Sequence, residues 1–347
     1  MLTASEREPD RTSPEWKARE TLISRAKVFH PNPGGQDAAD PNLAAEEVVC
    51  HYVLKPAKAT TPKFDCRLEN GDVVKVKYGR SRERQGEAAA TRLLATLGFG
   101  ADRVEIMRRV RCHGCPPWPF QLRILAEQFL LVPLFERAVA LAGVREFEWV
   151  AVERKLAGRA IEVDGFEGWD WRELDLLEPG KGGATRAELD ALRLVAVLLG
   201  HWDNKAPNQR LVCLGPEKGH DPDAPCDVPL LMLQDVGATF GPTKVNYEAW
   251  SALPIWKDAA TCTVSMETMP YEGILFPPVQ ISEGGRRLLA GRLRTLSRAE
   301  VQALFERAHF PRPVIDGKQA EDVLPWVDAF EAKIRQIADR APCPLFP

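Results

Sequence analysis

The stretch His201-Trp-Asp-Asn-Lys-Ala-Pro-Asn-Gln209 decides how the rest of this sequence is interpreted. It carries a histidine, an aspartate, a lysine and an asparagine in the spacing H-x-D-x-K-x-x-N. Just before it, Thr185-Arg-Ala-Glu188 has the form of a capping box and is followed by leucines at helical spacing up to Gly200. The polar stretch is therefore predicted to be a loop that directly follows a helix.

Two β-rich runs come after this loop, at 210–214 and 230–234, with an insert rich in proline and aspartate between them. The second run leads directly into Asp235-Val-Gly237. One predicted hairpin thus separates the polar loop from a second aspartate, which has a glycine two residues after it. We expect the carboxylates of Asp203 and Asp235 to converge on a shared cation.

These residue types suit the transfer of a phosphoryl group, which depends on positioning and charge neutralisation more than on covalent chemistry. Asp203 can orient an attacking hydroxyl and accept its proton. Asn208 and Asp235 offer the oxygen ligands that Mg²⁺ prefers. Lys205 places a mobile positive charge beside the group in transit. Asp203 and Lys205 are therefore the candidate catalytic residues, and Asn208 and Asp235 the candidate metal ligands.

The first half of the sequence carries a hairpin signal, because β-rich runs at 64–68 and 73–78 flank an Asn-Gly pair. In the second run the period of two places Lys75 and Lys77 on the same face. A helix is predicted over 86–97, with Glu87 in its first turn. Further strands are expected around 104–110 and 149–153, so this half is predicted to be a small sheet with one inserted helix.

With these residues in place, the chain resembles the protein-kinase-like superfamily over roughly residues 50–310. It is most similar to atypical members, the Golgi secretory-pathway kinases and the CotH-type kinases, and the matching turn is Asp235-Val-Gly-Ala-Thr-Phe-Gly241. The resemblance implies an α+β, two-lobed protein-kinase-like fold with a small, mainly β N-lobe containing one helix and a larger, mainly α C-lobe. It also implies ATP and Mg²⁺ or Mn²⁺ as cofactors.

By the same resemblance, a strand lysine held by a helix glutamate would bind the nucleotide phosphates. Lys77 is preferred to Lys75 because V-K-V-K ends like the V-A-I-K signature of kinases, and Glu87 is preferred to Glu83 as its partner. The adenine would lie between the lobes near 150–155.

The sequence also departs from the kinase pattern. The segment 55–62, where a glycine-rich loop belongs, has no glycine, so phosphate contacts there would come from threonine hydroxyls, backbone N–H groups or Lys58. Trp202 replaces the usual arginine, and no A-P-E follows Asp235. Regulation by a phosphorylated loop and a standard peptide-docking platform are therefore not expected.

Two other functions remain open on these residues. One is a pseudokinase, a nucleotide-binding module without turnover, which the missing glycine loop favours. The other is an enzyme on the same fold that transfers AMP instead of phosphate. The individual residues also have structural interpretations: Asp203 and Asp235 as loop caps, His201 as a brace of the loop, the two lysines as a solvated strand edge, and Glu87 as a helix-dipole carboxylate.

Composition limits the class of protein. The length of 347 residues allows one large domain or two lobes, and we divide it into an extended, partly disordered lead-in at 1–47, an N-lobe at 48–157 and a C-lobe at 158–347. The net charge of -3 gives no electrostatic case for nucleic acid, and no uncharged apolar run is long enough to span a membrane. The expected partners are a nucleotide and an unidentified hydroxyl-bearing acceptor.

Eight cysteines are too few for a disulfide-built scaffold of this length. Cys112-His-Gly-Cys115 is the one close pair, and it can be a disulfide, two reduced thiols or part of a metal site. The charged N-terminus has no signal peptide, so a cytoplasmic location is expected as the sequence is written. A Cys112–Cys115 disulfide would instead suggest an exported protein whose signal was removed.

Overall fold

The computed structural model describes residues 10–32, 47–56, 61–79, 81–163, 166–215, 225–242, 245–266, 278–310 and 322–344. In the first half, five strands close into a small barrel in the order β1-β2-β3-β5-β4. Their bounds are β1 Glu47–Val53, β2 Lys63–Leu68, β3 Val73–Lys77, β4 Arg103–His113 and β5 Val144–Arg154. β1 pairs with β4 in parallel, and the other neighbours are antiparallel.

The predicted hairpin is confirmed by β2 and β3, which pair with Cys66 opposite Val74. Gly71 closes the turn with a φ of 87°, a backbone conformation that glycine adopts without steric cost. Val74 and Val76 are buried in the apolar cluster of the barrel. Because strand side chains alternate, the side chains of Lys75 and Lys77 project from the opposite face of β3.

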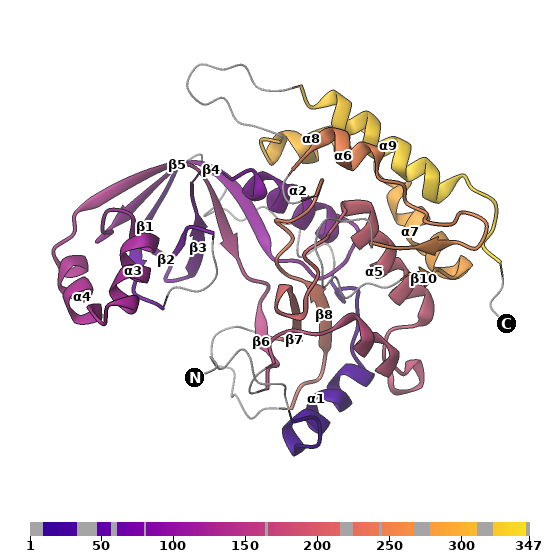
Figure 1. The fold of residues 1–347 in the computed structure, drawn as a ribbon, viewed down its shortest axis with the longest axis horizontal. Helices are drawn as coiled ribbons and strands as arrows, with labels where there is room; N and C mark the ends of the chain where they lie inside the picture. The colour runs from indigo at the N-terminus through magenta and orange to yellow at the C-terminus, as the bar shows by residue number, and fades with distance from the viewer. Residues whose placement is uncertain are drawn as a thin grey trace.

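The expectation of one helix in the segment 48–157 is wrong, because its described residues contain three (Figure 1). α2 (Glu83–Thr96) is the predicted helix and begins three residues earlier than expected. α3 (Pro119–Gln128) and α4 (Val132–Ala140) are inserted between β4 and β5, and each has a proline in its first turn. No helix was predicted between 110 and 149, so both are additions to the expected arrangement.

The expected extended lead-in at 1–47 is also wrong where it is described. Residues Pro14–Ser24 form helix α1, in which the Ser13 hydroxyl accepts a hydrogen bond from the Trp16 backbone N–H at 3.1 Å. Trp16 and Ile23 are buried, and the Arg19 guanidinium pairs with Glu173. The Ser-Pro start and the apolar residues of this helix outweigh the polar composition of the segment as a whole.

The second half is mainly helical around a three-stranded sheet in the order β6-β7-β8. The strands are β6 Gly158–Ala160, β7 Gln209–Leu214 and β8 Pro229–Leu233. The helices are α5 Arg186–Leu199, α6 Tyr247–Ala252, α7 Glu283–Leu293, α8 Arg298–Arg307 and α9 Leu324–Ala338, with the short turns η3 Trp171–Leu176, η4 Pro179–Lys181 and η5 Ala206–Asn208.

Several predictions for this half are confirmed. The predicted capping boxes begin α5 and α8, with both reciprocal hydrogen bonds present in each. α5 ends at Gly200, whose φ of 63° is left-handed. From Leu189 to its end α5 is completely buried, so this helix forms the centre of the core. Its close approach to α7 requires Gly285, where an added Cβ would lie 2.4 Å from the Asp190 Cβ.

Three pairs of cysteines lie at disulfide distance: Cys50–Cys66, Cys213–Cys226 and Cys262–Cys343. Cys112 and Cys115 are buried and are not joined, so the disulfide considered for them is wrong. The hint of an oxidising or exported environment comes from the other six cysteines instead.

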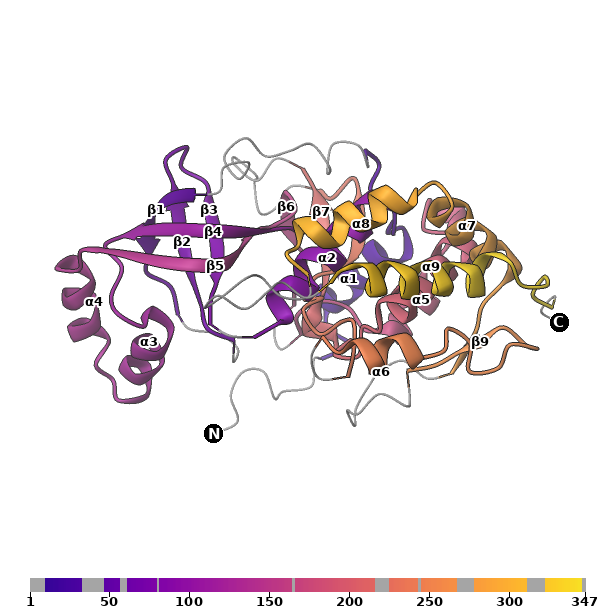
Figure 2. The ribbon, with the colours of Figure 1, turned by 90° about the horizontal axis from the view of Figure 1, so that it is seen from above.

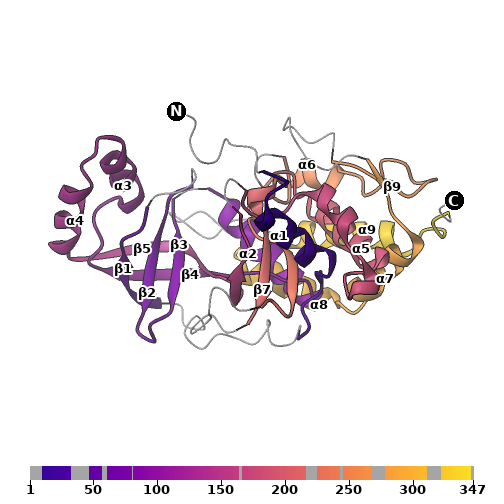
Figure 3. The same cartoon turned by 90° about the horizontal axis from the view of Figure 1, so that it is seen from below.

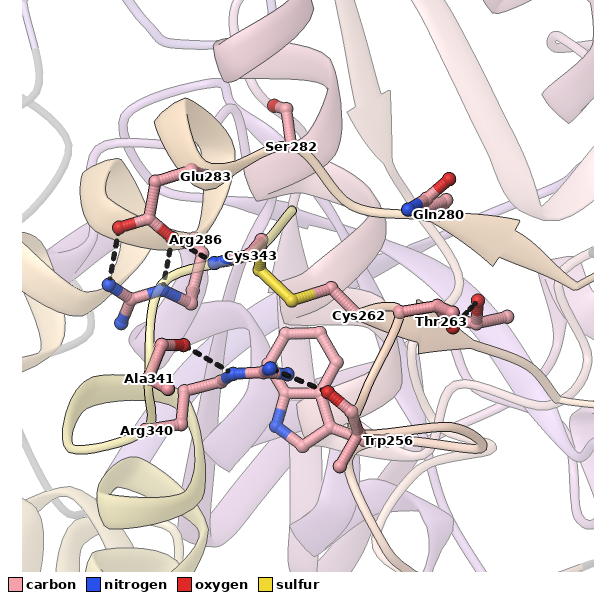
Figure 4. The surroundings of a disulfide bond; sticks show 12 residues. Trp256, Cys262, Thr263, Gln280, Ser282, Glu283, Arg286, Arg340, Ala341 and Cys343 are labelled. Atoms are coloured by element: carbon pink, nitrogen blue, oxygen red, sulfur yellow. Dashed lines mark hydrogen bonds and ion pairs between the residues drawn. A yellow bond between two sulfur atoms is a disulfide. The ribbon is translucent and has the colours of Figure 1, made fainter. Parts of the chain in front are cut away.

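Figure 4 shows the pair that joins distant parts of the chain, Cys262–Cys343, which ties the C-terminal segment to the short hairpin β9 (Thr263–Val264) and β10 (Val279–Gln280). Beside it, the Glu283 carboxylate accepts the Cys343 backbone N–H at 2.8 Å and pairs with Arg286 at 2.7 Å. The C-terminal segment is therefore held by covalent and polar contacts together.

The barrel lies at one end of the long axis and α5, α7 and α9 lie at the other, with α2 and the β6-β7-β8 sheet between them (Figures 1 and 2). α3 and α4 extend beyond the barrel at the end remote from α7 (Figure 3). Among the described residues, no helix has the length and apolar character that crossing a membrane requires.

Candidate functional site

Lys77, at the end of β3, is the centre of a buried charge cluster. Its Nζ lies 2.5 Å from a carboxylate oxygen of Glu87 in α2 and 2.9 Å from one of Glu153 in β5. All three residues are at most 6% exposed. The strand register explains the second contact, because Lys75 faces Glu153 and Lys77 faces Ala151, which brings both lysines beside the Glu153 side chain.

Lys75 has a different environment. Its Nζ contacts Glu153 at 2.5 Å, and its side chain is 22% exposed, three times as much as that of Lys77. Glu87 pairs with Lys77, while Glu83 accepts a hydrogen bond from the Thr61 hydroxyl at 3.3 Å. The structure therefore pairs the preferred strand lysine with the preferred helix glutamate.

The electrostatics of this cluster favour a charged lysine. Burial opposes the charge on Lys77, but the carboxylates of Glu153, Glu87 and Asp235 outweigh burial and raise its pKa. Burial raises the pKa of Glu87 to about 7, although Lys77 opposes that rise. Burial also acts on Asp235, yet Lys77 and the neighbouring lysines keep the pKa of Asp235 below its usual value. Asp235 therefore lies within electrostatic reach of Lys77 and is ionised at neutral pH.

The loop 201–208 is fixed by hydrogen bonds to its own backbone. The Asn204 side chain donates to the His201 carbonyl at 3.0 Å, and the Asn204 carbonyl accepts from the indole N–H of Trp171 at 3.0 Å. His201 is completely buried, and burial lowers its pKa to about 4, so its ring is neutral at pH 7. Asp203 and Asp235 both oppose this lowering of the His201 pKa, so both carboxylates lie within electrostatic reach of the buried ring.

Asn208 connects the two aspartates. Its side-chain amide donates to the Asp203 carbonyl oxygen at 2.6 Å, and its own carbonyl oxygen accepts the Asp235 backbone N–H at 3.1 Å. The Asn208 amide oxygen is not used in either bond and remains a candidate metal ligand. Lys205 is exposed, and its Nζ contacts the Asp203 carboxylate at 3.1 Å.

Helix α2 packs directly on the Asp235-Val-Gly237 turn. A Cβ added at Gly86 would lie 3.3 Å from the Gly237 carbonyl oxygen and 3.1 Å from Val245. A Cβ added at Gly237 would lie 3.5 Å from the Glu83 backbone oxygen. This close contact sets how far the turn carrying Asp235 lies from the helix carrying Glu87.

A cavity of about 540 Å³ lies beside the chain segment that leaves β5. Its walls include Val73, Lys155 and Leu156 from the barrel side and Leu214 from β7. Val73 shares the face of β3 that carries Lys75 and Lys77, because the three residues alternate along the strand. The cavity thus adjoins the same strand face as the charge cluster.

The structure brings Lys77, Glu87 and Asp235 together. The loop that carries Asp203, Lys205 and Asn208 is joined to Asp235 by the backbone hydrogen bond of Asn208. Lys75 lies at the edge of the cluster, and Lys58 lies outside the described residues.

Two residues with a place in this cluster were missed by sequence reasoning: Glu153 and Lys63. Lys63 lies opposite Lys77 in the β2–β3 register, and its pKa is lowered by burial and by Lys77 and Lys75. Extending the predicted hairpin by one pair would have found Lys63, whereas Glu153 depends on the pairing of β3 with β5.

Comparisons with known proteins add little to this geometry. No protein-family model matches the chain, and no curated protein matches it. Among solved structures, the chain is similar to a proinflammatory kinase of Helicobacter pylori, CtkA, with a TM-score of 0.45 and 8% sequence identity, over 84% of this chain and 93% of that one. A likeness this weak carries no argument about the site, which is interpreted from its own residues.

Proposed function

We propose that this protein is a phosphotransferase that uses ATP with Mg²⁺ or Mn²⁺ and acts on a hydroxyl acceptor, on a two-lobed, protein-kinase-like fold. The observation that carries the proposal is the arrangement of the Lys77–Glu87 ion pair beside Asp235, with Asp203 and Asn208 attached to the Asp235 backbone through two hydrogen bonds. These five residues come from four separate segments, and their links support the proposal because structural caps alone would not require them.

Each residue in the cluster fits one part of phosphoryl transfer. Lys77, held by Glu87 and Glu153, would bind nucleotide phosphate oxygens, and Lys63 and Lys75 add positive charge beside it. The oxygens of Asp235 and Asn208 form a hard donor set that fits Mg²⁺ or Mn²⁺, a metal that supplies charge neutralisation at the transferred group. Asp203 would orient the acceptor hydroxyl and take its proton.

The cavity beside β5 is the place we assign to the nucleotide base. Val73 and Leu214 give it apolar walls, and the segment 154–157 supplies backbone groups there. A purine in this cavity would lie on the strand face that leads to Lys77, so base and phosphates would follow β3.

The proposal is tested by incubating the full chain with Mg·ATP and a panel of hydroxyl-bearing acceptors and measuring intact masses. Addition of a phosphoryl group is expected, and Asp203→Asn should slow it by about 10²- to 10⁴-fold, the usual contribution of a general base. Lys181→Asn, in an exposed loop, is the matched control and should retain full activity. Addition of AMP would identify the transferase alternative, and nucleotide binding without any transfer would identify a pseudokinase.

A further inference from the structure

Four of the eight cysteines lie together in the interior of the barrel. Cys50 in β1, Cys66 in β2, Cys112 in β4 and Cys115 just after β4 are each at most 1% exposed. All four belong to the apolar cluster that fills the barrel. Cys50 and Cys66 form a disulfide, and Cys112 and Cys115 are not joined.

The free Cys112 thiol lies against this disulfide. Cys112 is directly opposite Cys50 in the parallel β1–β4 register, and its sulfur lies 3.7 Å from that of Cys66. The sulfurs of Cys50, Cys66 and Cys112 all lie within 4.8 Å of one another. Cys115 lies outside this group of three, and its side chain hydrogen-bonds with that of Cys112 three residues before it.

This arrangement matches the donor set of a tetrahedral zinc site. Zinc binds four cysteine sulfurs at about 2.3 Å, which places neighbouring sulfurs about 3.8 Å apart. The 3.7 Å between Cys66 and Cys112 is close to that spacing. The two-residue spacing between Cys112 and Cys115 is typical of zinc ligands, and Cys50 and Cys66 would supply the second pair from adjacent strands.

We propose that the barrel binds one zinc ion through Cys50, Cys66, Cys112 and Cys115 when the Cys50–Cys66 disulfide is reduced. A dithiol reductant transfers two electrons and two protons to the disulfide and itself becomes a disulfide. The S–S bond breaks, and two thiols form. Zinc then takes the place of the four thiol protons, which pass to solvent.

A buried tetrathiolate site carries net negative charge, and the barrel has a cation near it. Arg123 of α3 is buried, and its Nη1 makes no hydrogen bond within the described structure. Tyr52 lies within electrostatic reach of Cys115, Arg123 and Cys112 alike. The Nε of Arg123 pairs with the Glu127 carboxylate at 2.6 Å, so this cation is already matched by one carboxylate and would offset only part of the charge of the site.

The consequence concerns the barrel strands β1, β2 and β4. β1 and β2 would be cross-linked in both redox states, by the disulfide under oxidising conditions and by the metal under reducing ones, and the metal would add β4 to this link. Among the described residues, Cys50, Cys66 and Cys112 are the one group of three or more metal-ligating side chains close enough to share an ion, so Cys213–Cys226 and Cys262–Cys343 serve as controls.

The test uses the full chain, reduced with a dithiol under anaerobic conditions, loaded with Zn²⁺ and freed of unbound metal. Atomic emission should find one zinc per chain. Cys112→Ser and Cys115→Ser should each lose at least ten-fold in zinc affinity, while the Cys213→Ser/Cys226→Ser double variant keeps the metal. Zinc contents that are the same in Cys112→Ser as in the wild type, or the absence of zinc from the reduced wild type, would overturn the proposal.

A second measurement avoids variants that fail to fold. The reduced wild-type chain is alkylated with and without Zn²⁺, and each cysteine is followed by peptide mass mapping. Zinc should slow the alkylation of the four barrel cysteines by at least ten-fold and leave Cys213 and Cys226 unchanged. Equal rates at Cys112 and Cys115 with and without zinc would also refute the site.

Discussion

Lys77 and Lys75 leave the same face of β3, but they differ in burial and in the number of carboxylates they contact. Lys77 neutralises two buried carboxylates, whereas Lys75 contacts one of these and is partly exposed. Lys77→Met would leave Glu87 with no cation and should lower the free energy of unfolding by about 3–5 kcal/mol. Lys75→Met leaves Glu153 paired with Lys77 and should cost about 1 kcal/mol or less. Urea denaturation at pH 7 measures both, and equal losses would contradict the assignment.

His201 makes stability depend on pH in a defined window. Its pKa in the folded chain is about 4, below the ordinary value of 6.5, so the folded state favours the neutral ring. This contribution is fully present above pH 6.5 and is lost as the pH falls towards 4, with a total of about 3 kcal/mol. Between pH 7 and 4, the free energy of unfolding taken from denaturation curves should therefore fall more steeply with falling pH for the wild type than for His201→Gln. Identical pH dependence in the two proteins would show that His201 is not buried as a neutral ring.

At the residue level, the sequence predicted the members of the loop and turn but only part of their surroundings. His201, Asp203 and Asn208 follow one another within a short motif, so their spacing could be recognised directly. Glu153 could not be recognised, because its contact with Lys77 depends on the pairing of β3 with β5, in which Lys75 and Glu153 are 78 positions apart, and composition and local periodicity do not reveal this pairing.

At the level of elements, the contact between α2 and the Asp235 turn depends on the absence of a side chain at Gly86. Gly86→Val should push the turn away from α2 and weaken Mg·ATP binding by at least ten-fold, because a Cβ there already meets Val245 at 3.1 Å. Gly291→Ala is a matched control in helix α7, where an added Cβ meets nothing within 4 Å. It should raise the free energy of unfolding by about 0.5–1 kcal/mol and leave binding unchanged. Normal nucleotide affinity in Gly86→Val would refute this role for the contact.

The elements that local chemistry specifies were predictable, and those that depend on tertiary packing were not. The Asn-Gly hairpin and the capped helix α5 each carry their start and stop signals in adjacent residues. α1 is stabilised by contacts with Glu173 and the β8 region, far along the chain, so the polar composition around it was misleading. α3 and α4 were missed because apolar residues such as Leu125 in α3 and Leu134 in α4 remain exposed and break the usual amphipathic pattern.

For the whole molecule, the disulfide Cys262–Cys343 closes the longest loop of the three, with 81 residues of sequence separation. Its removal in Cys262→Ser/Cys343→Ser should lower the free energy of unfolding under oxidising conditions by about 2–5 kcal/mol. Because Figure 4 places it among α7, β9 and the C-terminal segment, the affinity for Mg·ATP should stay the same. A loss of nucleotide binding in a folded double variant would show that this end of the molecule is coupled to the site.

The pairing of the cysteines could not be predicted from sequence, because eight cysteines allow many connectivities and the joined residues lie up to 81 positions apart. The order of the motifs predicts that the Asp203 and Asp235 carboxylates converge on a shared cation, and this stays a prediction; the structure links the backbones of the two residues through Asn208. The central claim is that Mg·ATP binds at Asp235, and a binding measurement tests it.

The most direct test of that claim is titration calorimetry of the full chain with ATP in the presence of Mg²⁺. The wild type should bind one nucleotide per chain in a metal-dependent manner, and Asp235→Asn should lose at least ten-fold in affinity because a carboxylate ligand of the metal is removed. Asp258→Asn, an exposed aspartate near the β9 hairpin, should bind like the wild type. An Asp235→Asn variant that binds Mg·ATP with unchanged affinity, or a folded wild type that binds none, would contradict the account.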